Sequence, residues 1–487
     1  MNGRATRLLG AAALLLCCRG DLVAQQPTAE PQRFLFSRAA QQDSDGFYFQ
    51  PAGLCEDYPE ETTTSEKIAA DFDVLRRTGT KLLRFGVGWD GIETAPGTYD
   101  WRLLDEIVAA AERDGITLLP YVCYTPEWAG SAGANSWREP PRNMNRFGSF
   151  VSALASRYRG KVKSWELWNE PDNRDYWRGT PKQFAAMFKS GAQAIRRADP
   201  EATIVLGGLT QPPRSAFFQA AVSRHELWRW FDVLNFHGYF ETWDPAPPDE
   251  LARRASAYAG ALRRHTPAAW QRDIWLAEFG YSSLPPRAGR VSEWVRARDA
   301  HEHTTEFQAV TLLRQHFVAL AAGQLSLTAW FRIRDLPAGD DVIGDDNNRH
   351  FGLVDTAGAP KPAFDAMRLW NELTSQPIRR ARTPAREQHA SGLALHVFER
   401  IDGTLIVAAW LRSHGAPPNG AQPPPADTRR EVVDVQLPHD RRMQMRVHRS
   451  RRASDEQPPR IRDGVLFDVV VTGDDIFIAE LRPESLD

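Results

Sequence analysis

Short apolar runs alternate with segments of helical periodicity between residues 47 and 377. In each helical segment, apolar residues recur at intervals of three or four positions, as on one face of a helix. Buried strands that alternate with helices are typical of a parallel sheet with its helices outside. The predicted strands are 47–54, 81–87, 117–122, 162–168, 203–206, 233–236, 273–277 and 325–331, and the predicted helices are 65–77, 101–114, 147–158, 181–198, 215–225, 248–264, 306–322 and 362–373.

Eight strand–helix units are the number that a closed (β/α)8 barrel needs. An open, doubly wound parallel sheet is the structural alternative, but no glycine-rich phosphate loop follows the first predicted strand. We therefore expect an α/β fold with a TIM barrel over residues 47–377.

The pattern changes after residue 377. Runs of alternating polarity at 393–398, 405–410, 431–437 and 465–471 are separated by turn signals such as Asp402-Gly403 and Asp463-Gly464. Residues 417–425 are rich in proline and indicate a loop. We predict a C-terminal antiparallel β-sandwich-like accessory domain over residues 378–487, packed beside the barrel because the connection is short.

The N-terminus has the features of an export signal. Arg4 and Arg7 precede an apolar stretch at 8–18 that is too short to span a bilayer, and Ala24 offers a small residue for cleavage. We expect a signal peptide at 1–24, an N-terminal segment at 25–46, and export to the periplasm or the exterior. A lipid anchor at 17–18 fits less well, because leucines precede the two cysteines where small residues are wanted. Cys55 and Cys123 then remain, as a disulfide or as two buried thiols.

The charge balance excludes some partners. The chain has 60 Lys and Arg against 62 Asp and Glu, a formal net charge of -2. There is no basic excess of the kind that nucleic acids or anionic membranes attract, so we expect neither as a partner. The acidic run at 340–348 matches no calcium-loop spacing, and we predict a solvated loop there and no metal site.

Two glutamates stand at strand ends. Glu170 follows Asn169 at the end of the fourth predicted strand, and Pro171 stops that strand from continuing. Glu278 ends the seventh strand, which faces the fourth across the barrel mouth. A facing pair of carboxylates is what cleavage of a glycosidic bond requires, one as proton donor and one as nucleophile or base. The alternative is that both are ordinary exposed loop acids.

These residues carry a family resemblance. "WELWNEPD" at 165–172 and "WLAEFGYSS" at 275–283 resemble the retaining glycoside hydrolases of clan A. Supporting stretches are "RFGVGWDGIETAPGTYDW", "YTPEWA", "LNFHGYF" and "FGLVDTAGAPKP", so the resemblance runs from about residue 84 to 370. The text around the motifs is most similar to family 39, with family 5 as the runner-up.

The resemblance implies roles for residues in this chain. Glu170 would be the acid/base and Glu278 the nucleophile, Asn169 would hold the substrate 2-hydroxyl, and Arg84 and Tyr239 would flank Glu278. This chemistry needs no cofactor. Family 5 enzymes usually carry a histidine near the end of strand three, where this chain has Tyr124, and that departure favours family 39. The remaining expected sugar contacts are Trp89, Tyr124, Trp128, Trp177, His237 and Trp330; Trp330 is expected as the floor beneath the reacting sugar, and His237 is as compatible with a core role as with a sugar contact.

Three functions fit the sequence. The favoured one is a retaining O-glycoside hydrolase acting on a β-linked oligo- or polysaccharide. The others are a catalytically silent carbohydrate-binding barrel and a transglycosylase, which would pass the sugar to a sugar acceptor in place of water. The glycan, its linkage, endo or exo action and the oligomeric state are left open by the sequence.

Overall fold

The computed structural model describes residues 42–266, 272–285, 290–292, 295–297, 301–339, 343–381, 392–412, 429–448 and 458–484. The predicted signal peptide and the predicted loop at 417–425 lie outside these ranges.

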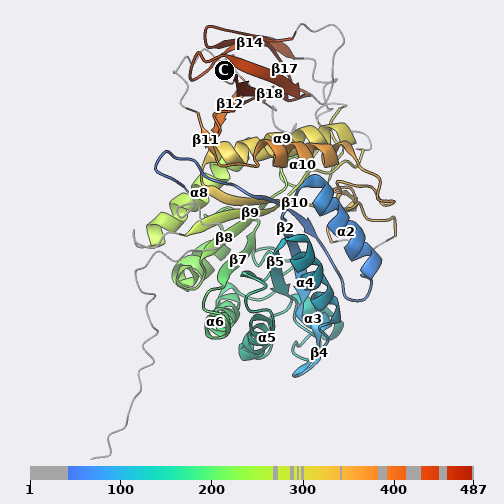
Figure 1. Cartoon of the computed structure of the whole chain (residues 1–487). Helices are drawn as coiled ribbons and strands as arrows, with labels where there is room; N and C mark the ends of the chain where they lie inside the picture. Colours follow the sequence, from blue (N-terminus) through green and yellow to red (C-terminus); the bar gives the residue numbers. More distant parts are fainter. Residues whose placement is uncertain are drawn as a thin grey trace, which may run out of the picture. The chain divides into compact units, whose positions relative to one another are not determined.

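A closed barrel of parallel strands forms the first part of the described chain, which confirms the predicted fold class (Figure 1). Around the barrel, the strands follow the order β1-β10-β9-β8-β7-β6-β5-β2. The first strand begins later than the predicted 47–54, because Tyr48 pairs instead with Ile378 in an isolated antiparallel bridge. The barrel strands are β1 (Ala52–Glu56), β2 (Leu82–Gly88), β5 (Thr117–Cys123), β6 (Ser164–Leu167), β7 (Thr203–Leu209), β8 (Val233–Gly238), β9 (Asp273–Phe279) and β10 (Leu325–Phe331).

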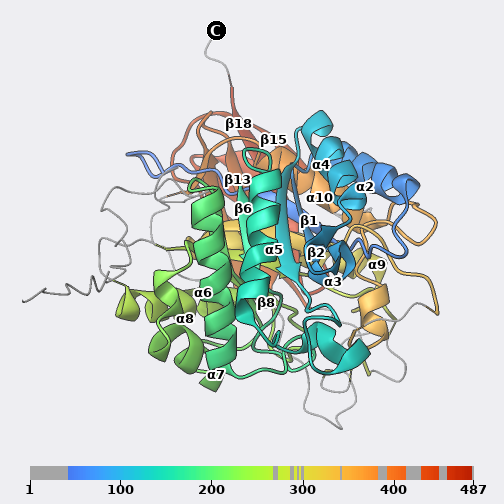
Figure 2. The ribbon, with the colours of Figure 1, turned by 90° about the horizontal axis from the view of Figure 1, so that it is seen from below.

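Helices cover the outside of the barrel, and Figure 2 shows α5 and α6 side by side on it. Local sequence fixes their ends: Thr180 and Gln183 form a capping box at the start of α6, and Gly79 ends α2 at a φ of +72°. The segment predicted as a helix at 215–225 is the short α7 (Ala216–Phe218) continued by a π-helix, η2 (Gln219–Arg224). The other outer helices are α2 (Ser65–Thr78), α4 (Arg102–Asp114), α5 (Met144–Arg157), α6 (Pro181–Ala198), α8 (Glu250–His265), α9 (Thr305–Ala322) and α10 (Pro362–Leu373).

Two antiparallel sheets follow the barrel. The larger has the order β11-β12-β13-β18-β15 and the smaller the order β14-β17-β16. Buried side chains of β13, β14, β17 and β18 form one apolar cluster, so the two sheets share a core as in a sandwich. The strands are β11 (Ile378–Arg380), β12 (Leu393–Arg400), β13 (Leu405–Leu411), β14 (Arg430–Gln436), β15 (Met443–His448), β16 (Arg460–Arg462), β17 (Val465–Thr472) and β18 (Phe477–Pro483).

Helix α9 carries the contact between the barrel and these sheets. Phe317 stacks on Phe398 of β12 with ring centroids 6.0 Å apart. Arg314 Nη2 donates to the carbonyl oxygens of Gly473 and Asp475, at 3.0 and 2.6 Å. The barrel core therefore continues into the first sheet, although the exact domain boundary at 377 stays a prediction.

The two remaining cysteines are both buried and free, so the open disulfide question is answered by two thiols. Cys55 donates from Sγ to the carbonyl oxygen of Ala277 at 3.2 Å. Within the described ranges, no helix combines the length and the apolarity that crossing a membrane requires.

Candidate active site

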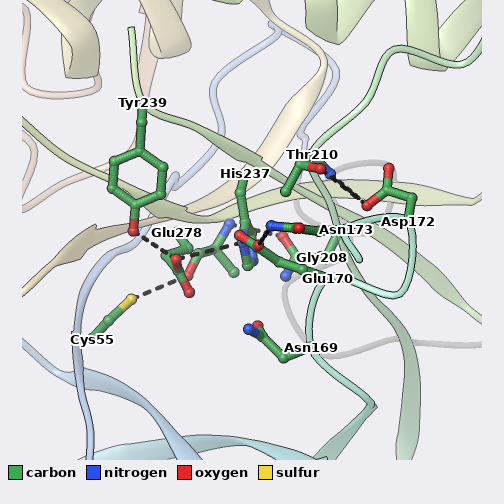
Figure 3. A network of polar contacts seen from close by, with 12 residues as sticks. Cys55, Asn169, Glu170, Asp172, Asn173, Gly208, Thr210, His237, Tyr239 and Glu278 are labelled. Atoms are coloured by element: carbon green, nitrogen blue, oxygen red, sulfur yellow. Dashed lines mark hydrogen bonds and ion pairs between the residues drawn. The ribbon is translucent and has the colours of Figure 1, made fainter. Parts of the chain in front are cut away.

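The carboxyl ends of β6, β8 and β9 bring a set of polar side chains together at one end of the barrel, and Arg84 reaches them from within β2. Figure 3 shows Glu170 and Glu278 facing each other beside His237, with Tyr239 and Asn169 close by. Both glutamates are largely buried, at 6% and 9% exposed. Side chains that converge in this way from separate strands form the usual site of chemistry in this fold.

The loop after β6 displays Glu170 in an uncommon backbone conformation. Trp168 and Glu170 have φ angles of +76° and +43°, in the left-handed region that residues other than glycine rarely adopt. Gly207 of β7 makes room for this loop, because a Cβ there would lie 2.3 Å from the Trp168 carbonyl oxygen. Asp172 ties the loop to the end of β7 by accepting from the backbone N–H groups of Thr210 and Gln211, at 3.0 and 2.8 Å. The surrounding structure thus holds Glu170 in place at the cost of local strain.

The two oxygens of Glu170 accept from different side chains. Nδ1 of His237 lies 2.8 Å from Oε1, and Nδ2 of Asn173 donates to Oε2 at 2.9 Å. Asn173 is itself oriented, because its Oδ1 accepts from the backbone N–H of Asp175 at 3.0 Å. The carboxyl group is therefore positioned without an ion pair to a lysine or arginine of the described chain.

Glu278 lies in a more cationic setting. Arg84 Nη1 donates to Oε2 and the Tyr239 hydroxyl donates to Oε1, both at 2.6 Å. Burial alone would raise the pKa of Glu278, but the nearby charges of His237 and Arg84 and the hydrogen bonds from Tyr239 and Arg84 outweigh it and lower this pKa below its usual range. Burial raises the pKa of Tyr239 well above its ordinary value, so the phenol stays a donor. Glu278 is thus held ionised.

His237 lies between the two glutamates. Its Nδ1 is 2.8 Å from Glu170 Oε1 and 3.5 Å from Glu278 Oε1. Burial opposes a charge on the imidazole, yet Glu278 and the hydrogen bond to Glu170 raise the pKa of His237 above its ordinary value. The ring packs against the backbone of Gly208, where a Cβ would come within 1.9 Å of Nε2. The structure thus places His237 at the glutamate pair, and its contact with a sugar stays a prediction.

Arg84 is fixed from the opposite side. It is 1% exposed, and its Nε and Nη2 donate to the two oxygens of Glu166, both at 2.9 Å. Glu166 also accepts from Asn235 Nδ2 at 3.0 Å, inside the barrel. Arg84 Nη2 further donates to Oδ1 of Asn169 at 3.0 Å, which leaves the Asn169 amide N–H groups for another partner. The guanidinium is locked in a bidentate ion pair and cannot swing away from Glu278.

The spacing of the pair bears on its chemistry. One atom each from Glu170, His237 and Glu278 lie within 4.8 Å of one another. Inverting glycosidases need about 6.5–9.5 Å between their carboxyl groups, and retaining ones about 5–5.5 Å. The three residues could also hold a divalent metal ion, but each carboxylate oxygen already accepts a hydrogen bond, one of them from cationic Arg84. These contacts favour a hydrogen-bonded carboxylate pair over a metal centre.

Not every predicted sugar contact lies at this site. Trp89 is fully buried, packs edge-on against Trp128 at 5.9 Å, and donates from Nε1 to Glu93. Trp128 is half-buried and donates to the carbonyl oxygen of Glu93. Tyr124, directly after β5, is half-buried against Trp168 at 5.8 Å. Trp89 therefore belongs to the core, and among the described residues no hydrogen bond joins Trp128 or Tyr124 to either glutamate.

The predictions for Trp330 and Trp177 are wrong. Trp330 is 0% exposed and packs on Phe279 and on His316 of helix α9, so it points toward the helices. Trp177 is 1% exposed and packs edge-on against Trp168 at 5.0 Å. Neighbouring strand residues point to opposite faces, so the next residue, Phe331, is the one that turns to the barrel mouth and meets Tyr239 at 6.1 Å.

Glu166 and Asn173, which contact Arg84 and Glu170, were not predicted from the sequence. Both stand in the stretch around "WELWNEPDN", four residues before and three residues after Glu170. A period of two along β6 places Glu166 on the same face as the strand end, which is a signal that could have found it. No sequence signal marks Asn173, since its role depends on how the loop turns back.

The comparisons with known proteins identify the family of this chain. The family model described as Cellulase (glycosyl hydrolase family 5) matches residues 43–305. A β-xylosidase of Caldicellulosiruptor saccharolyticus is 36% identical over 70 residues, 13% of this chain and 14% of the relative. A β-xylosidase of Geobacillus stearothermophilus is 21% identical over 298 residues, 56% of this chain and 52% of the relative. The chain thus spans about half the length, at most, of these two relatives.

A solved structure of a family 39 glycoside hydrolase from the gut symbiont Bacteroides cellulosilyticus WH2 has the same fold. It superposes with a TM-score of 0.65 at 17% identity, covering 89% of this chain and 81% of that one. The predicted resemblance to clan A is confirmed. The family model corresponds to family 5, the runner-up in the prediction, whereas the solved family 39 structure shares the fold of this chain. Because the family model spans more than half of the 487 residues, the chain belongs to the clan A family described as Cellulase (glycosyl hydrolase family 5).

Proposed function

We propose that this protein is a retaining O-glycoside hydrolase that cleaves a β-linked oligo- or polysaccharide by double displacement. The observation that carries the proposal is the facing pair Glu170 and Glu278, of which one carboxylate oxygen each lie within 4.8 Å of one another, at the ends of β6 and β9. The different hydrogen-bond partners of the two carboxyl groups support different roles for them. Family membership supports a carbohydrate substrate.

In the first step, the ionised carboxylate of Glu278 attacks the anomeric carbon and the glycosidic C–O bond breaks. Glu170 gives its proton to the leaving oxygen, so that the departing sugar leaves as an alcohol. Arg84 and Tyr239 keep Glu278 ionised before the attack. The free amide N–H of Asn169 is available to the 2-hydroxyl of the reacting sugar, a contact expected to strengthen in the transition state.

In the second step, Glu170 acts as a base. It takes a proton from water, the water oxygen attacks the anomeric carbon, and the ester bond to Glu278 breaks to return the carboxylate. The charge on Glu278 disappears when the ester forms and returns when it is hydrolysed. His237, which lies within reach of both carboxyl groups, is placed to respond to that change.

Substrate and location extend the proposal. The relatives named β-xylosidase make β-linked xylosides the first substrates to test. The basic and apolar pattern of residues 4–24 supports an exported protein that meets its glycan outside the cytoplasm.

A covalent trap tests the proposed function. The wild-type protein is first screened against aryl β-glycosides and β-linked polysaccharides. It is then treated with a 2-fluoro analogue of the best aryl glycoside that carries a strongly acidic phenol as leaving group. The fluorine slows both steps, but the good leaving group speeds formation of the ester, so that the ester accumulates. We expect a protein whose mass rises by one fluorosugar, with the label on the peptide that contains Glu278. A label on another residue would overturn the nucleophile, and hydrolysis that proceeds with no label under any trapping condition would overturn the double displacement.

A further inference from the structure

A half-buried tryptophan beside the catalytic pair has no part in the chemistry above. Trp243 follows β8 by five residues and packs against Tyr239, with ring centroids 4.7 Å apart. Tyr239 in turn donates to Glu278. Trp243 therefore lies one side chain away from the proposed nucleophile, at the carboxyl end of the barrel.

The loop after β10 holds the indole in one orientation. Nε1 of Trp243 donates to Oδ1 of Asp345 at 3.0 Å. Gly344, with a φ of +91°, passes against the ring, so that a Cβ there would lie 3.7 Å from Cζ2. Asp345 is itself placed at the start of a short 3-10 helix, η4 (Asp346–Arg349), where Oδ1 also accepts from the backbone N–H of Asn347 at 3.1 Å. Within the acidic run seen in the sequence, Asp345 thus serves as the clamp for this tryptophan.

The aromatic rings beside Trp243 are inclined to its indole. Its two aromatic neighbours, Tyr239 and Phe351, meet it at interplanar angles of 62° and 50°, so neither stacks flat on the indole. Its polar edge is satisfied by a carboxylate, and it stays partly exposed, unlike the fully buried Trp89, Trp165 and Trp330. A rigid, partly exposed aromatic ring with its N–H satisfied suits the apolar C–H face of a sugar.

We propose that Trp243 is a specificity-determining wall of the subsite for the sugar that Glu278 attacks, and that Asp345 acts through it as a positioning residue. This inference rests on the proposed function. Trp243 stands on the Glu278 side, next to Tyr239, whereas the leaving group departs toward Glu170. The ligand it fits is a pyranose of xylose or glucose configuration, whose equatorial hydroxyls leave axial hydrogens on both ring faces.

Substitution of Trp243 tests the stacking role. With an aryl β-xyloside or β-glucoside as probe, Trp243→Ala should raise KM about tenfold, by loss of one aromatic contact, with a much smaller effect on kcat. The rise should be the same for good and poor leaving groups, because the contact is with the attacked sugar. Trp243→Phe should show a smaller rise. An unchanged KM, or a fall in kcat with a shifted acid limb of the pH profile, would assign Trp243 only to the support of Tyr239 and overturn the proposal.

A double-mutant cycle tests the clamp. Asp345→Ala should raise KM in the wild-type background and have no further effect in Trp243→Phe, which lacks the N–H that Asp345 binds. Asp346→Ala is the matched control, because its side chain is 78% exposed and, among the described residues, pairs with Arg349 alone. Equal effects of Asp345→Ala in both backgrounds would contradict the clamp.

Binding separates this inference from the proposed function. Calorimetric titration of wild type and Trp243→Ala with xylo-oligosaccharides requires no turnover. Wild-type binding that weakens in Trp243→Ala supports the wall even if the protein hydrolyses nothing, in which case the hydrolase proposal alone fails. Wild-type hydrolysis with identical binding by both proteins overturns the wall and leaves the hydrolase intact.

Discussion

The surroundings of Glu278 and Glu170 differ in the kind of donor that each carboxyl group meets. Glu278 accepts from a guanidinium and a phenol, Arg84 and Tyr239, both at 2.6 Å. Glu170 accepts from the neutral amide of Asn173 at 2.9 Å, and its Oε1 lies 2.8 Å from Nδ1 of His237. Arg84 carries a permanent charge that a second ion pair with Glu166 holds in place, whereas histidine can gain and lose a proton near neutral pH.

This difference shows how one barrel mouth can assign two roles to the same residue type. A nucleophile must stay ionised, and a fixed cation at its side ensures that. An acid/base must change protonation twice in each turnover, and a permanent cation would hinder its first role. Substitutions around Glu278 and substitutions around Glu170 should therefore have different effects on the rate of hydrolysis and on its pH dependence.

The largest effect is expected at the nucleophile. Glu278→Gln keeps the side-chain volume but removes the attacking oxygen, so kcat should fall by about 10⁴-fold or more on every substrate. Binding of oligosaccharide should persist, as measured by calorimetry. The matched control is Glu201→Gln, because Glu201 is exposed and lies just before β7, at the amino end of the barrel. Wild-type activity in Glu278→Gln would show that another group attacks.

The next effect depends on the leaving group. Glu170→Ala should slow hydrolysis of natural glycans by about 10²–10⁴-fold, since a sugar leaves poorly without a proton. Aryl glycosides with a strongly acidic phenol should react faster than glycans in this variant. Added azide needs no base, so it should restore turnover and give a glycosyl azide with the configuration of the substrate. Equal losses for all leaving groups, without azide rescue, would count against Glu170 as the acid/base.

A shift in the pH dependence of activity is expected when the Tyr239 hydroxyl is removed. Tyr239→Phe removes a donor to the ionised form of Glu278, and the pKa of Glu278 should therefore rise toward its usual range. The acid limb of the kcat/KM profile should move to higher pH, so that activity is lost at pH values where the wild type still works. An unmoved acid limb would mean that this limb reports a different group.

The smallest effect is expected at Asn173. Asn173→Ala removes one neutral hydrogen bond to Glu170, worth about 1 kcal/mol, and should lower kcat about fivefold. The neighbouring Arg174→Ala is a suitable control, since the Arg174 side chain is exposed and donates to the carbonyl oxygen of Arg178, which takes no part in the site. A loss as large as that of Glu170→Ala would show that Asn173 takes part in the chemistry itself.

The sequence predicted the glutamates and their partners through one geometric rule. Asn169, Glu170, Tyr239 and Glu278 all follow predicted strands, and Arg84 lies within one; the carboxyl ends of parallel strands meet at one end of a barrel. The predicted limits of a strand can differ from the observed ones by several residues, as in β1, and the carboxyl ends of the strands still lie at the same end of the barrel. This is why the site was predictable although the fold was known only as a pattern.

The sugar contacts of the tryptophans were less predictable, because they depend on which face of a strand a side chain lies on and not only on where the residue stands in the strand. Trp330 and Phe331 are adjacent, yet one meets helix α9 and the other the barrel mouth. A one-residue difference reverses the face of a strand residue. Trp243 lies in a loop, where no periodicity applies, and its orientation depends on Asp345 about one hundred positions later in the chain.

The most direct test of the retaining mechanism is the configuration of the first product. Proton NMR can follow the anomeric signal during rapid hydrolysis of a β-glycoside, before the free sugar equilibrates. Two successive displacements at the anomeric carbon predict that the β-anomer appears first and the α-anomer grows in slowly. Initial release of the α-anomer would show a single displacement, and would contradict the role of Glu278 as a covalent nucleophile.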